Sequence, residues 1–81
     1  MERFRCPCCG FFTFGNKPTG TFEICQVCYW EDDQIQNEDP EFDGGANDIC
    51  LSEARKNFEE FGAVKAEYVK LVREPYESEK P

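Results

Sequence analysis

The chain has 81 residues, with 17 Asp and Glu against 9 Lys and Arg, and its formal net charge is −8. A chain of this length forms one domain, whose small apolar core is marginal unless disulfides or a metal ion support it. The negative charge repels phosphate and argues against a nucleic-acid partner, because nucleic-acid binding depends on Lys and Arg.

The first ten residues, MERFRCPCCG, contain charges and cysteines where a secretory signal peptide needs an uninterrupted apolar run. An apolar run of about 18 residues is also absent, so no membrane span is expected. We therefore expect a cytoplasmic protein, in which thiols stay reduced and paired cysteines are metal ligands or redox groups.

Four of the six cysteines form two Cys-x2-Cys pairs, Cys6 with Cys9 and Cys25 with Cys28, with fifteen residues between the pairs. This spacing is typical of a zinc site, because two intervening residues let both sulfurs of a pair face one ion. The chain has no histidine, so the predicted site is one zinc ion held by four thiolates. Four protein ligands leave no open position for water, which makes the site structural.

Each cysteine pair, with the residue that follows it, is called a knuckle: residues 6–10 and residues 25–29. Cys8 lies between the ligands of the first knuckle, where a side chain faces outward, and we expect that it is not a ligand. Gly10 can take a positive φ where the chain leaves the first knuckle. Tyr29 stands at the corresponding place in the second, which leaves that turn open.

Between the knuckles, the stretch FFTFGNKPTGTFEI alternates apolar and polar residues on both sides of a turn-rich centre. The pattern predicts a two-stranded antiparallel hairpin. Its apolar face would carry Phe12, Phe14, Phe22 and Ile24.

Seven of the thirteen residues at 31–43 are acidic, and Pro40, Gly44 and Gly45 interrupt any periodic element. We predict a solvated loop over residues 31–45. A carboxylate site for calcium, magnesium or a basic partner is the alternative, but the oxygen spacing of an EF-hand is absent.

Residues 48–63 carry apolar side chains at helical spacing, and Gly62 is a suitable helix stop. The predicted helix face consists of Leu51, Ala54, Phe58 and Phe61. Its N-cap is ambiguous, with Asp48 and Ser52 as candidates. A second, shorter helix over residues 64–72 would present Val64, Tyr68 and Leu71.

The predicted fold is a small α+β metal-bound domain: a zinc-ribbon-like β-hairpin with two cysteine knuckles and one or two C-terminal helices. The domain spans residues 1–75, and residues 76–81 form a flexible tail. The motifs CPCCG, C-x-x-C-Y-W-E-D-D, GGAN and LSEARKNFEEFGA, in this order, resemble the bacterial cysteine-rich CPCC family over roughly residues 4–73. The resemblance implies a zinc-ribbon-like site without an assigned activity. It also implies that Cys50, where members carry a hydroxyl residue, is not a ligand.

The leading functional hypothesis is a zinc-stabilised module for protein–protein interaction, not an enzyme. Its first candidate surface, facing a basic partner, consists of Tyr29, Trp30, Glu31, Asp32 and Asp33. The competing interpretation is that Trp30 belongs to the core and the acidic residues are merely solvated.

Three other functions stay open. A rubredoxin-like electron carrier would hold iron in the same four-sulfur geometry, although the gap is short and the helical C-terminal part is foreign to rubredoxins. Cys8 and Cys50 could serve an enzyme or a thiol redox factor, but the usual histidine base of a cysteine nucleophile is missing. A nucleic-acid-binding zinc ribbon would use a local basic patch of Arg3, Arg5, Lys17, Arg55 and Lys56.

Overall fold

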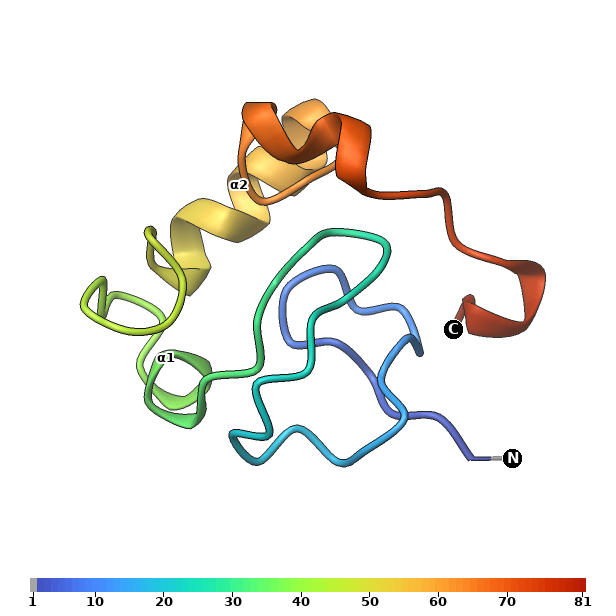
Figure 1. Cartoon of the computed structure of the whole chain (residues 1–81), viewed down its shortest axis with the longest axis horizontal. Helices are drawn as coiled ribbons and strands as arrows, with labels where there is room; N and C mark the ends of the chain where they lie inside the picture. The colour runs from blue at the N-terminus through green and yellow to red at the C-terminus, as the bar shows by residue number, and fades with distance from the viewer. Residues whose placement is uncertain (1) are drawn as a thin grey trace.

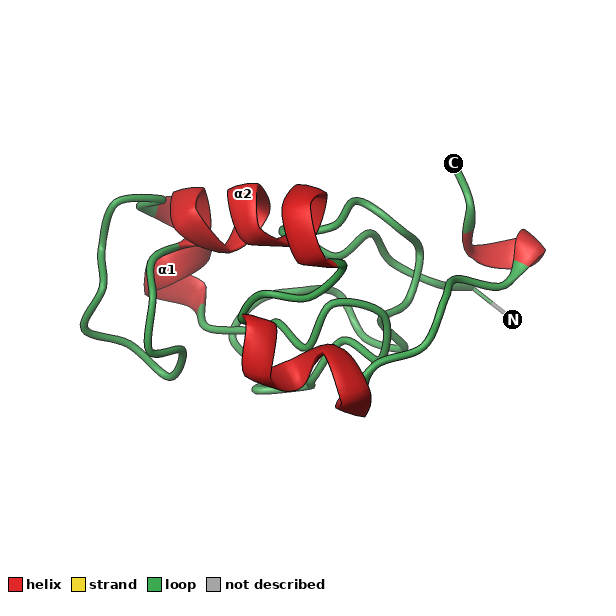
Figure 2. Cartoon of the chain, turned by 90° about the horizontal axis from the view of Figure 1, so that it is seen from above, coloured by secondary structure: helices red, strands yellow, loops and turns green. Residues whose placement is uncertain are grey.

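Loops rather than strands build the first part of the chain. The computed structural model describes residues 2–81 and contains two α-helices, α1 (Gln34–Glu38) and α2 (Leu51–Phe61). Two 3₁₀ helices follow, η1 (Ala66–Leu71) and η2 (Glu77–Glu79). Helices α2 and η1 lie above the loop-built part in Figure 1, and Figure 2 shows them on opposite sides of the intervening loops.

The predicted hairpin between the knuckles is wrong. Phe14 pairs with Phe4 and Ile24 pairs with Glu31, each through an isolated antiparallel bridge, and residues 2–81 contain no longer strand. Each knuckle reverses the chain by itself, so the two segments that flank one knuckle become neighbours. Phe22 also has a φ of 63°, which interrupts the extended segment that the alternation requires. The bridges therefore close the knuckles individually instead of joining them.

The predicted common face is lost with the hairpin. Phe14 is fully buried, whereas 58% of Phe22 and 41% of Ile24 are exposed. Phe12 is half-buried, beneath the guanidinium of Arg5, which lies 4.9 Å from its ring centre.

Residues 31–45, predicted as a solvated loop, contain helix α1 and deeply buried polar side chains. Asp32 and Gln36 are both 0% exposed. One oxygen of Asp32 accepts hydrogen bonds from the backbone N–H groups of Gly20 and Thr21, at 3.0 and 2.8 Å. The Gln36 amide donates to three backbone carbonyl oxygens, of Phe42, Asn47 and Ile49. The prediction holds for residues 41–46, which are exposed and outside any helix. It is wrong for Asp32 and Gln36, because these polar groups are buried by hydrogen bonds to nearby backbone, which composition does not reveal.

The helix predicted over residues 48–63 is confirmed as α2 and ends at the predicted stop, but neither Asp48 nor Ser52 is its N-cap. Cys50 is its N-cap without a side-chain bond to the helix, and Gly62 ends it with a φ of 88°. Leu51 and Ala54 are fully buried, whereas the predicted core position Phe61 is 41% exposed. The buried face is therefore confined to the first half of the helix.

The second predicted helix is the 3₁₀ helix η1, which begins two residues later than expected. Val64 is buried just before it, and the ring of Tyr68 packs on Tyr29 with 4.6 Å between ring centres. Leu71 is 60% exposed and lies outside the core.

The fully buried side chains gather around the cysteines. Trp30, Phe14 and Leu51 are the largest apolar members of this cluster, and Val27 lies at the tip of the second knuckle. Trp30 also donates from its ring N–H to Asn37 at 3.0 Å. Among residues 2–81, no helix has both the length and the apolar character that crossing a membrane would require.

Candidate metal centre

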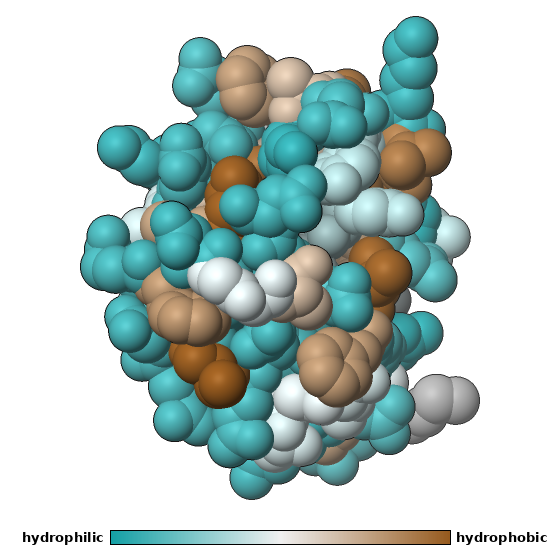
Figure 3. Space-filling view, turned by 60° about the vertical axis from the view of Figure 1, so that its left-hand side comes forward, coloured by the Kyte–Doolittle hydropathy of each residue, from teal (hydrophilic) through white to brown (hydrophobic). Residues whose placement is uncertain are grey.

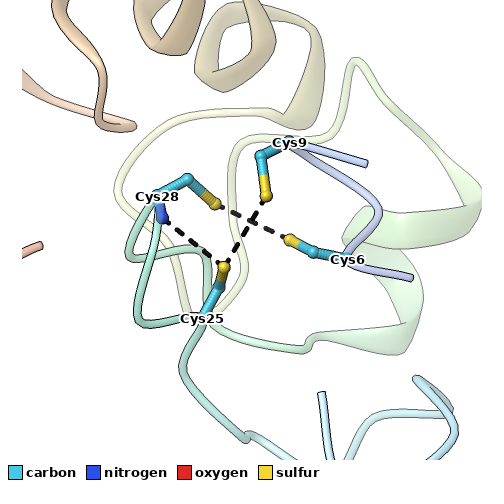
Figure 4. A group of neighbouring side chains, drawn as sticks. All are labelled: Cys6, Cys9, Cys25 and Cys28. Carbon is cyan, nitrogen blue, oxygen red and sulfur yellow. Dashed lines mark hydrogen bonds between the residues drawn. The ribbon is translucent and has the colours of Figure 1, made fainter. Parts of the chain in front are cut away.

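Four sulfur atoms from the two knuckles converge on one point. The ligand atoms of Cys6, Cys9, Cys25 and Cys28 all lie within 4.8 Å of one another, and Figure 4 shows the four side chains directed inward. The sulfurs are 3.6 Å apart for Cys6 and Cys28, and 3.7 Å apart for Cys9 and Cys25. A tetrahedral ion with metal–sulfur bonds of about 2.3 Å requires sulfur separations of about 3.8 Å. The donor set therefore fits a four-thiolate metal site.

The same distances argue against disulfides. A disulfide requires an S–S separation of about 2.05 Å, and all six cysteines carry free thiols. The buried cluster needs some other partner for its sulfurs, and a metal ion satisfies that need.

Both knuckles have the same backbone hydrogen bonds. In the first, the Gly10 N–H donates to the carbonyl oxygen of Cys6 at 2.9 Å, and the Cys6 N–H donates to that of Phe11 at 2.9 Å. In the second, the corresponding bonds run from Tyr29 to Cys25 at 2.8 Å and from Cys25 to Trp30 at 2.9 Å. The residue after each second ligand has a positive φ, 81° and 76°. The open question about the second turn is thus answered, since Tyr29 takes the conformation of a glycine.

Cys25 receives the most support among the four sulfurs. The backbone N–H groups of Val27 and Cys28 donate to its Sγ, both at 3.4 Å. The hydroxyl of Thr13 lies 3.0 Å from the same sulfur, within hydrogen-bonding distance. Thr13 is 6% exposed and comes from the segment after the first knuckle, so it joins the two halves of the site. Thr13 was not among the predicted site residues. The only feature of the sequence that marked it was a hydroxyl group between two phenylalanines.

Without a cation, the cluster cannot hold four thiolates. Burial raises the pKa of the Cys28 thiol well above its ordinary value. Hydrogen bonding with Cys25 raises the pKa of Cys6, whereas hydrogen bonds from Cys28, Cys6 and Cys9 strongly lower that of Cys25. The negative charge is therefore shared unevenly among protonated neighbours, and a bound divalent ion would displace those protons.

The other two cysteines lie outside this group of four. The side chain of Cys8 was expected to face outward, but it is only 9% exposed and packs in the core. Cys50 is half-buried at the start of α2.

The predicted partner surface is only partly a surface. Trp30 and Asp32 are 0% exposed, so neither side chain can contact another protein. Tyr29, Glu31 and Asp33 are half-buried. A hydrogen bond from the backbone of Ala46 lowers the pKa of Asp33, whose carboxylate also caps helix α1 through the Gln36 N–H.

Residues 2–81 form a small domain with a few helices and a four-cysteine cluster compatible with metal binding. A family model described as cysteine-rich CPCC matches residues 4–79. The protein belongs to the cysteine-rich CPCC family, which confirms the resemblance in its motifs. The match extends beyond residue 73 and includes η2. No curated protein matches the chain.

Proposed function

We propose that the protein is a binding module whose fold depends on one structural zinc ion held by Cys6, Cys9, Cys25 and Cys28. The observation that carries this proposal is the convergence of the four sulfurs within 4.8 Å. Four protein ligands fill a tetrahedral shell and leave no position for a substrate or an activated water. Structural zinc contributes about 10–16 kcal/mol in zinc-finger peptides, which exceeds the stability of most domains. The ion would therefore decide whether this chain folds.

Elemental analysis of the purified protein tests the metal. We expect one zinc per chain, a colourless sample, and loss of the folded state on chelation, followed by circular dichroism. Cys8→Ser and Cys50→Ser are the matched controls and should keep the zinc. A red protein with visible charge-transfer bands would indicate the rubredoxin-like iron carrier instead, because iron accepts the same four-sulfur geometry. A folded protein without any metal would contradict the proposal.

The distribution of charge supports a basic protein as the partner. Residues 31–48 contain eight acidic residues and no Lys or Arg, so this segment accounts for the whole net charge of −8. In the rest of the chain, nine acidic residues balance nine basic ones. Several acidic side chains of the segment are exposed: Glu38, Asp39, Glu41, Asp43 and Asp48. Ile35 and Phe42 add exposed apolar surface to it. Figure 3 shows such apolar patches separated by hydrophilic side chains on one face.

Such a field attracts cationic surfaces and repels nucleic acid at long range. A histidine base for thiol catalysis is also lacking, because the chain contains no histidine. We therefore propose a role in binding rather than catalysis, in the reducing cytoplasm where free thiols persist.

Co-purification from the native host tests the partner. The variant Glu38→Gln/Glu41→Gln/Asp43→Asn neutralises the acidic segment, and Glu59→Gln/Glu60→Gln on α2 is the matched control. We expect a basic protein to co-purify with the wild type and the control, and to be lost with the first variant. Retention of that protein by the first variant, or recovery of nucleic acid, would contradict this part of the proposal.

A further inference from the structure

The C-terminal segment carries a partly buried ion pair that contacts the second knuckle and the segment after the first knuckle. The guanidinium of Arg73 donates to both carboxylate oxygens of Glu79, at 2.9 and 2.8 Å. Glu79 is 2% exposed, although it lies only two residues from the last residue of the chain. We call this pair, with its contacts to Gln26 and Phe12, the clasp. It lies outside the four-cysteine site, and the sequence analysis assigned it no role.

On one side, the clasp holds the second knuckle. The backbone N–H of Arg73 donates to the carbonyl oxygen of Gln26 at 3.0 Å. Its guanidinium also reaches the side-chain oxygen of Gln26, at 3.3 and 3.4 Å. Gln26 directly follows the ligand Cys25, so Arg73 fixes the turn that directs both sulfurs of this knuckle.

On the other side, the clasp holds the segment after the first knuckle. The carbonyl oxygen of Glu79 accepts a hydrogen bond from the N–H of Phe12 at 2.8 Å. The next residue is Thr13, whose hydroxyl lies 3.0 Å from the sulfur of Cys25. The clasp therefore fixes both neighbours of Cys25: the turn that contains it and the segment that brings the hydroxyl.

We propose that Arg73 and Glu79 are positioning residues of the metal centre, and that the clasp slows release of the bound ion by holding the second knuckle against the segment after the first knuckle. This inference rests on the proposed structural metal site. Groups that orient metal ligands change metal affinity by about 10–100-fold when they are removed.

The pair is ionised when it acts. The hydrogen bond from Arg73 lowers the pKa of Glu79, and the same bond raises the pKa of Arg73. Removal of one partner leaves the other partly buried without its counter-charge, which is costly. Both members of the pair also contact Tyr76. Its backbone N–H donates to the Glu79 carboxylate at 2.8 Å, and the Arg73 guanidinium lies 3.9 Å from the centre of its ring. These contacts fix the chain between Arg73 and Glu79.

The test measures zinc dissociation into excess chromophoric chelator for the full chain loaded with one zinc. The clasp variants are Arg73→Gln, Glu79→Gln and Arg73→Lys, the last of which keeps the charge but loses the planar fork. The matched control is Lys80→Gln/Glu77→Gln, which removes the exposed ion pair of the same segment. We expect release to be about 10–100-fold faster in the clasp variants and within about twofold of wild type in the control.

A second control separates positioning from general stability. Gln36→Ala removes the hydrogen bonds of a fully buried amide in α1 without touching the clasp. In the cobalt-substituted proteins, we expect the ligand-field bands to shift in Glu79→Gln and to stay unchanged in Gln36→Ala. Unchanged release in both Arg73→Lys and Glu79→Gln would overturn the inference, as would equal acceleration in Gln36→Ala. If the wild type binds no metal, the proposed function itself fails, which is a different result.

Discussion

The two knuckles have the same backbone and different surroundings. Each has the same pair of backbone hydrogen bonds and a positive φ at its last residue. In the second knuckle, both cysteines are 0% exposed, whereas Cys9 of the first is only half-buried. Cys25 accepts two backbone N–H bonds, and within residues 2–81 the equivalent pair is not found at Cys6. Identical turns are thus placed in unequal environments.

The unequal burial of the two knuckles indicates which half of the site anchors the ion. A buried, hydrogen-bonded sulfur keeps its position without the metal more readily than an exposed one, because burial and donors both restrict it. We therefore expect the second knuckle to bind first and release last.

The largest effect on zinc binding is expected when a single ligand is removed, either from the second knuckle or from the first. We expect Cys25→Ser to lose most of the roughly 10–16 kcal/mol that structural zinc supplies, and with it the folded state. Cys9→Ser should keep measurable zinc binding, because water can reach the exposed corner and serve as the fourth ligand. Isothermal titration with zinc and circular dichroism measure both. Equal losses in the two variants would show that the knuckles are equivalent and would break the comparison.

Removing the hydroxyl that supports Cys25 comes next. Thr13→Val keeps the shape of the side chain and loses the contact to the sulfur at 3.0 Å. We expect zinc affinity to fall by about 10–100-fold, the usual cost of losing an outer partner of a metal ligand. Competition with a chelator of known affinity measures the change. Thr13→Ser keeps a hydroxyl and should therefore retain most of the wild-type zinc affinity. If Thr13→Val binds zinc like the wild type, the hydroxyl does not support the site.

The sequence predicted the metal cluster because the spacing of the cysteines is a local property. The same holds for α2, where apolar spacing and Gly62 define the end of the helix. The hairpin was wrong because alternation of Phe12, Phe14, Phe22 and Ile24 does not state which segments pair. Each knuckle brings its own flanks together first, and this decides the pairing.

Side chains that act across the chain could not be predicted either. Thr13 lies 12 residues from Cys25 along the chain, and Arg73 lies 47 residues from Gln26. Nothing in the local sequence of either residue marks such a contact. Buried polar residues such as Asp32 and Gln36 escape composition for the same reason, because their partners are set by the fold.

A smaller effect on stability is expected from the positive φ that both knuckles have at their last residue. A Cβ at Gly10 would have nothing within 4 Å, so Gly10→Ala isolates the backbone cost of about 1–2 kcal/mol. Tyr29 already bears that cost, and Tyr29→Gly should therefore be more stable than Tyr29→Ala by about 1 kcal/mol. Both Tyr29 variants lose the ring contact with Tyr68 at 4.6 Å, which cancels in this comparison. Thermal unfolding of the zinc-loaded proteins measures the differences. Equal stability of Tyr29→Gly and Tyr29→Ala would mean that the turn is unstrained.

The smallest effect is expected for Arg55, which holds the first knuckle as Arg73 holds the second. Its guanidinium donates twice to the carbonyl oxygen of Pro7, at 3.1 and 2.9 Å, but the side chain is exposed. Water can replace an exposed donor, so Arg55→Gln should lower the free energy of unfolding by less than about 1 kcal/mol. Lys56→Gln, an exposed neighbour on α2, is the control.

Arg73 and Arg55 differ in burial, and their effects on zinc release therefore test whether burial decides which knuckle anchors the ion. Arg73 belongs to a nearly buried ion pair, whereas Arg55 meets a carbonyl group that solvent can also reach. Zinc release should therefore change less than about twofold in Arg55→Gln, well below the change expected for Arg73→Gln. Stopped-flow release measured side by side gives the ratio. If Arg55→Gln releases zinc as fast as Arg73→Gln, both knuckles depend equally on their arginines, and burial does not decide which knuckle anchors the ion.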